Sequence, residues 1–166
     1  MRIWHQSLTV MGDVPGYQSA VEAHIARVVE PGTEVVLHGM LPSTFPSDFP
    51  LNELQYPALA YYHFNQLLSG AIAAEQQGFD AYAISTLPDY ALVESRSLVD
   101  IPVVAYGESA MLFSCTLGRR FGVLAFIEEL CQMVEENARR YGLGERCAGS
   151  RPVGDRKSTR LNSSHT

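Results

Sequence analysis

Hydroxyl and carboxylate side chains meet in one short stretch of the chain, S-T-L-P-D at 85–89. Ser85 and Thr86 can donate hydrogen bonds to a ligand carboxylate, while Leu87 and Asp89 complete the same loop. Ser, Thr and Asp also cap helices, so each residue has a structural interpretation beside the functional one. We favour ligand contact for Ser85 and Thr86, and an N-cap role for Asp89, which precedes a predicted helix.

Polar residues after two other apolar segments extend this candidate site. Gln6 and Ser7 follow a predicted first strand, either as ligand contacts or as an ordinary polar turn. Glu108 follows a later strand, where it can face a ligand or stabilise the positive end of the next helix. His5 is expected to be a strand-end residue.

The remaining reactive residue types do not form a recognisable centre. The other histidines are scattered and lack paired carboxylates, so we assign no metal. Cys115 and Cys131 fall in apolar helical patterns, and Cys147 is at most a weak candidate nucleophile. No glycine-rich phosphate motif is present, and we expect no cofactor.

Alternating strand and helix patterns must position these residues. Strands are predicted at 1–5, 33–38, 78–85, 101–106 and 120–126, with helices at 17–30, 58–77, 90–98, 110–117 and up to about 141. A loop is predicted at 107–109. This order predicts an α/β fold with a parallel sheet and helices on both faces. Ligands bind such sheets at the carboxyl ends of the strands, where 85–89 falls.

Composition excludes several classes of function. The chain has 166 residues, 46% of them hydrophobic, and a net charge of -6. The acidic balance argues against nucleic-acid and membrane partners, and favours a small-molecule ligand. Three cysteines without framework spacing and no signal-peptide pattern indicate a cytoplasmic protein. The proline-rich segment 40–56 is predicted to be a lid or a dimer contact.

Four segments together resemble the aspartate/glutamate/hydantoin racemase family. They are R-I-W-H-Q-S, D-A-Y-A-I-S-T-L-P-D-Y-A-L-V-E-S-R, D-I-P-V-V-A-Y-G-E-S-A-M and G-R-R-F-G-V-L-A-F, and the similarity runs from Met1 to about Val153. The resemblance implies two flavodoxin-like domains facing a cleft, and often a homodimer. It also implies cofactor-independent racemisation of a small carboxylate, such as an amino acid or hydantoin, by two cysteines.

This sequence departs from the family pattern in two places. Thr86 stands where the family has its first catalytic cysteine, and the second domain looks incomplete. We expect a first domain at 1–118, a truncated second at 119–154 and an unstructured, foreign-looking tail at 155–166. The chain itself is then expected to be inactive. One alternative is a one-cysteine relative, similar to arylmalonate decarboxylase, and another is a non-catalytic flavodoxin-like fragment.

Overall fold

The computed structural model describes residues 1–42, 44, 56–87 and 89–153. The chain forms two compact units, Met1–Tyr106 and Gly107–Thr166. The sequence predicted a domain boundary after residue 118, just past the C-terminal end of helix α5 (Tyr106–Leu117). In the structure nearly all of this helix belongs to the second unit. Most of 40–56 and the tail 155–166 lie outside the described residues.

The first unit is built on a parallel sheet, as predicted. Among the described residues it has four strands, β1 (Arg2–Ser7), β2 (Glu34–His38), β3 (Ala81–Ser85) and β4 (Val103–Ala105), in the order β2-β1-β3-β4. The expected turn at Gln6 and Ser7 is wrong. β1 continues through both residues because Gln6 pairs with neighbours on both sides and Ser7 pairs with β3.

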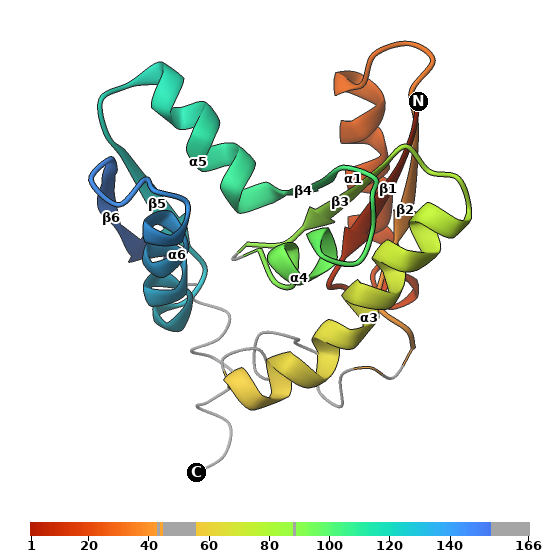
Figure 1. Cartoon of the computed structure of the whole chain (residues 1–166), viewed down its shortest axis with the longest axis horizontal. Coiled ribbons are helices and arrows are strands. Elements are labelled where there is room, and N and C mark those ends of the chain that lie inside the picture. Colours follow the sequence, from red (N-terminus) through yellow and green to blue (C-terminus); the bar gives the residue numbers. More distant parts are fainter. Residues whose placement is uncertain (43, 45–55, 88, 154–166) are drawn as a thin grey trace. The chain divides into compact units, whose positions relative to one another are not determined.

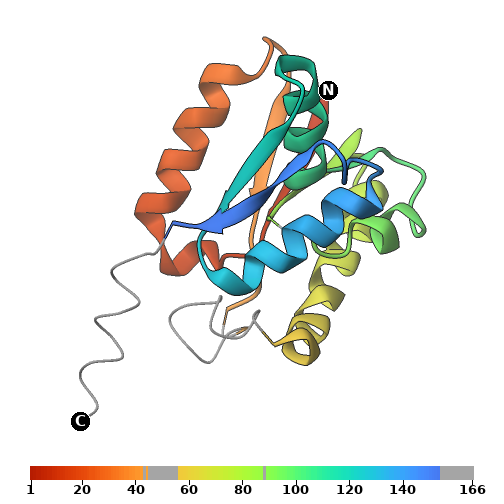
Figure 2. The ribbon, with the colours of Figure 1, turned by 90° about the vertical axis from the view of Figure 1, so that its left-hand side faces the viewer.

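Helices cover both faces of this sheet. Helix α1 (Pro15–Val28) and helix α3 (Pro57–Gln76) lie on opposite sides of it, as right-handed crossovers in opposite directions require (Figures 1 and 2). Both helices begin at a proline, which suits the first helical position because its missing N–H has no helical partner there. Short segments η1 (Met11–Asp13) and α4 (Leu92–Arg96) follow β1 and β3.

The end of α3 shows how local sequence fixes the entry to β3. Gly78 adopts φ 72°, its N–H donates to the carbonyl of Glu75, and the N–H of Phe79 donates to that of Ala74. These two bonds form a Schellman motif, which stops the helix and turns the chain into the sheet.

The core of the first unit lies between the sheet and α3. Tyr82 is completely buried there, and its hydroxyl donates to the Leu67 carbonyl at 2.8 Å. Gly70 allows this close approach, since a Cβ at that position would lie 2.9 Å from Tyr82 Oη and 3.0 Å from Gln6 Oε1. In contrast, α1 has no fully buried residue.

The second unit contains α5, β5 (Phe121–Ala125), α6 (Glu128–Arg140) and β6 (Cys147–Pro152). β5 and β6 pair in parallel, and α6 packs on them. The guanidinium of Arg146 donates to the carbonyls of Cys115 and Gly118 at 2.8 and 2.7 Å, which satisfies the C-terminal end of α5. None of the helices in the described ranges is both long and apolar enough to cross a membrane.

Candidate functional site

The candidate site lies where the connections of the first sheet reverse direction. The chain leaves β1 toward β2 and later returns past β1 to β3, so the switch point falls between these two central strands. Ser7 and Ser85 are directly paired at their carboxyl ends. The structure therefore brings together the two polar segments that the sequence singled out, at the edge where parallel sheets bind ligands.

Thr86 is the first residue beyond β3. It is only 7% exposed, and its Oγ1 forms no hydrogen bond with any described residue. An unpaired buried hydroxyl costs roughly 1 to 3 kcal/mol and is uncommon in folded proteins. Thr86 thus places a buried hydroxyl without a described partner at the switch point.

Gln6 and Ser7 are adjacent in β1 and point in opposite directions, because side chains alternate along a strand. Gln6 faces α3, where its Oε1 accepts from Trp4 Nε1 at 2.9 Å and its Nε2 donates to the Ser7 carbonyl at 3.0 Å. Gln6 is thus engaged inside the core. Ser7 is also buried, and its Oγ accepts a bond from the backbone N–H of Thr9 at 3.1 Å. Ser7 retains a hydroxyl proton to donate.

The loop that follows Thr86 differs from the sequence expectation. The N-cap residue of α4 is Ala91, so the N-cap interpretation of Asp89 is wrong. Asp89 is buried and adopts φ 61°, in the left-handed region. Ser85 and Leu87, the sequence neighbours of Thr86, are half-buried.

Sequence reasoning missed Tyr90, which is buried in the same loop. Its ring packs against Phe64 of α3 with a centroid distance of 4.7 Å, and burial raises its pKa to about 12. Only its aromatic character in a polar loop could have drawn attention to it.

Two histidines lie in the strands at this edge: His5 precedes Gln6 in β1, and His38 of β2 pairs with Gln6. His38 stacks on Trp4, with ring centroids 3.3 Å apart and planes at 5°. Burial lowers the pKa of both His5 and His38, so both are neutral at pH 7. Within the described ranges, no group of three or more His, Cys, Asp or Glu side chains could hold a metal ion.

Glu108 lies in the second unit. The predicted loop at 107–109 is wrong, because α5 begins at Tyr106, directly after β4, and Glu108 occupies its first turn. A carboxylate in the first turn interacts favourably with the positive end of the helix dipole.

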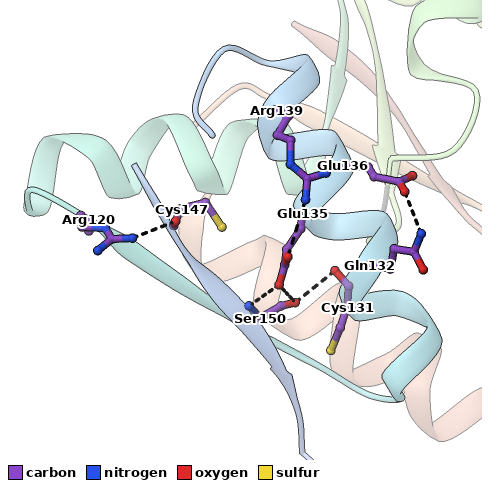
Figure 3. Close-up of polar contacts among 8 residues, drawn as sticks. All are labelled: Arg120, Cys131, Gln132, Glu135, Glu136, Arg139, Cys147 and Ser150. Atoms are coloured by element: carbon purple, nitrogen blue, oxygen red, sulfur yellow. Dashed lines mark hydrogen bonds and ion pairs between the residues drawn. The ribbon is translucent and has the colours of Figure 1, made fainter. Parts of the chain in front are cut away.

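All three cysteines also belong to the second unit, and no cysteine occurs before residue 115. Cys147 begins β6 and lines a hollow of about 220 Å³ with Glu135, Arg139 and Gly144. Figure 3 shows Glu135 accepting hydrogen bonds from the backbone and hydroxyl of Ser150, at 2.9 and 2.7 Å. These bonds lower the pKa of Glu135. The Glu135 carboxylate therefore holds α6 against β6 through these two hydrogen bonds.

The first unit is a parallel α/β fold with hydroxyl side chains at its switch point. A family model described as Asp/Glu/Hydantoin racemase matches residues 17–164. The chain belongs to this family. The match also reaches most of the segment that the sequence led us to set aside as foreign.

The chain is similar to proteins named as hydantoin and allantoin racemases. A hydantoin racemase from a Pseudomonas species is 32% identical over 82 residues, which cover 48% of this chain and 33% of that protein. The solved allantoin racemases from Klebsiella pneumoniae and Pseudomonas fluorescens both superpose with a TM-score of 0.76, at 20% and 21% identity. These alignments cover 96% and 98% of this chain but 65% and 66% of those structures. They support the fold.

Proposed function

We propose that this chain carries the ligand-binding half of a cofactor-independent racemase or epimerase that acts on a small carboxylate or hydantoin. Ser7, Ser85 and Thr86 supply hydroxyl and backbone donors at the switch point. An α-proton is a weak acid, so its removal is easier when fixed donors stabilise the negative charge that develops on the adjoining carboxylate or carbonyl.

One observation carries the proposal: Thr86 Oγ1 is buried at the switch point without a partner among the described residues. Ser95 Oγ on α4 is also buried without a described partner, so what favours ligand contact for Thr86 is its position directly after β3 at the switch point. An unpaired buried hydroxyl lowers stability, and a role in binding a ligand would explain why the protein keeps one at the carboxyl edge of the sheet.

The identity of residue 86 limits the chemistry that the first unit can perform. A threonine hydroxyl is a weak nucleophile and base unless a neighbour removes its proton, whereas a thiol ionises readily. The first unit contains no cysteine. In our proposal Thr86 therefore binds and orients the substrate, and the group that moves the α-proton comes from outside this unit.

A second candidate function follows from the same threonine. Loss of the thiol at position 86 also fits a one-cysteine decarboxylase or isomerase, in which a single thiol protonates a carbanion. Both candidates require the same donors at 85–86. They differ in whether the α-proton of an unreacted substrate exchanges with solvent.

The wider setting is proposed from the same family membership. The protein would act in the cytoplasm, which suits three free cysteines, and would assemble as a homodimer.

The experiment compares two variants that each remove a buried hydroxyl. Thr86→Val replaces the unpaired Thr86 hydroxyl by a methyl group. Ser95→Ala removes another buried hydroxyl without a described partner, on α4. Binding of 5-methylhydantoin and of aspartate is titrated by calorimetry, and stability is measured by urea unfolding.

We expect Thr86→Val to weaken binding about tenfold or more while unfolding at a higher urea concentration. Ser95→Ala should leave binding unchanged. Unaltered affinity in Thr86→Val, or no binding by the original chain, would contradict the proposal. Exchange of the hydantoin α-proton in D₂O, followed by NMR, then separates racemisation from decarboxylation.

A further inference from the structure

Two left-handed residues flank Tyr90 in the loop after β3. Asp89 has φ 61° and Ala91 has φ 58°. Asp tolerates this region moderately well, but for alanine it is uncommon because Cβ approaches the backbone carbonyl. Such conformations persist only where the surrounding structure holds them, and they cluster at functional sites.

The burial of Tyr90 holds the backbone of Asp89 and Ala91 in this conformation. Tyr90 and Ala91 are each 6% exposed, and the Tyr90 ring packs on Phe64 of α3. Phe64 also meets Tyr61 edge-on at 5.5 Å, but Tyr61 is 70% exposed. Tyr90 is therefore the member of this aromatic row that ties the loop to α3.

The loop that contains Tyr90 is also hydrogen-bonded to the backbone of Thr86. The N–H of Asp89 donates to the carbonyl of Thr86 at 3.4 Å, and the N–H of Leu92 donates to the carbonyl of Asp89 at 3.4 Å. These long bonds constrain the backbone weakly. The packing of Tyr90 against Phe64 is a further contact that holds the loop after Thr86.

We propose that Tyr90 is a positioning residue, whose packing against α3 holds Thr86 in its ligand-binding orientation. The inference rests on the proposed function, because it assigns a role in binding at the same edge. Loosening this anchor should reduce affinity even in molecules that remain folded, because binding must then also order the loop.

The test uses Tyr90→Leu, with Tyr61→Leu as the matched control. Leucine keeps an apolar side chain at position 90 but removes the ring that meets Phe64. Affinity for 5-methylhydantoin is measured by calorimetry at a temperature where circular dichroism shows both variants to be folded. We expect Tyr90→Leu to bind about three- to tenfold more weakly and Tyr61→Leu to bind like the original chain.

A second variant separates positioning from stability. Ala91→Gly removes the penalty of the left-handed conformation, so its thermal midpoint should not fall, while the freer backbone should still weaken binding. A purely structural role for Tyr90 predicts lower thermal midpoints with unchanged affinity, and that result would overturn the inference.

The two proposals fail in different ways. If the original chain does not bind, the proposed function fails and this inference with it. If Thr86→Val weakens binding but Tyr90→Leu and Ala91→Gly do not, only the positioning role of Tyr90 is rejected.

Discussion

Ser7 and Ser85 face each other at the carboxyl ends of β1 and β3, although one lies near the start of the chain and the other beyond its middle. The pairing follows from strand order, since β3 returns to lie beside β1 after β2 has formed on the other side. The switch point thus brings Ser7 beside Ser85 and its neighbour Thr86, which are distant from it in the sequence.

Substitution of Gly70 by alanine tests the close contact between α3 and the sheet. Alanine favours a helix by about 1 kcal/mol over glycine, but here its Cβ would lie 2.9 Å from Tyr82 Oη and 3.0 Å from Gln6 Oε1. Displacing these groups weakens the Tyr82 bond to Leu67, so we expect a net loss of about 1 to 3 kcal/mol in unfolding free energy. Urea unfolding measures it.

Gly16→Ala is the matched control, because Gly16 also lies in a helix but has no atom within 4 Å of an added Cβ. It should be neutral or stabilising by up to about 1 kcal/mol. A Gly70→Ala protein as stable as the original would show that the core around Tyr82 is looser than described.

The fold and its elements could be predicted largely from hydrophobic periodicity, but the ends of elements could not. β1 was expected to stop at His5 because Gln6 and Ser7 are polar, yet strand neighbours and side-chain bonds accommodate both. Likewise G-E-S at 107–109 looked like a loop, whereas α5 starts at Tyr106. Strand order also lay beyond a local pattern.

The candidate site could be located from sequence but not resolved into roles. The end of β3 placed Ser85 and Thr86 at the sheet edge. That Gln6 turns toward Gly70 and Trp4, while Thr86 has no described partner, depends on contacts between distant segments. The anchoring of Tyr90 by Phe64 is equally non-local.

Stability should fall in mild acid because of His5 and His38. Burial lowers both pKa values below 6.5, so the unfolded chain takes up protons at a pH where the folded chain does not. The contribution of the two histidines to the free energy of unfolding is complete above about pH 6.5, and it is lost as the pH falls through their pKa values in the folded chain. Thermal midpoints measured from pH 7.5 down to pH 5 should therefore decrease.

His5→Gln should reduce this pH dependence, because it removes one of the two partly buried imidazoles. Midpoints that stay constant or rise on acidification would show that the burial of the two imidazoles does not penalise their charge.

Arg146 should be important for the second unit. Arg146→Met removes the donors that satisfy the Cys115 and Gly118 carbonyls, and we expect a loss of about 1 to 3 kcal/mol in unfolding free energy. Hydrogen exchange should increase in the last turn of α5. Arg120→Met loses one longer bond, of 3.4 Å to the Cys147 carbonyl, and should change stability little. Equal effects in the two variants would contradict the capping role of Arg146.

The most direct test of the binding site is an NMR titration of the isotopically labelled chain with 5-methylhydantoin. Binding at the switch point predicts saturable shifts in the backbone amides of Ser7, Ser85 and Thr86, and in Thr86→Val these shifts should need about ten times more ligand or more to reach saturation. Absence of shifts at these three amides at saturating ligand, or shifts confined to the second unit, would contradict the account.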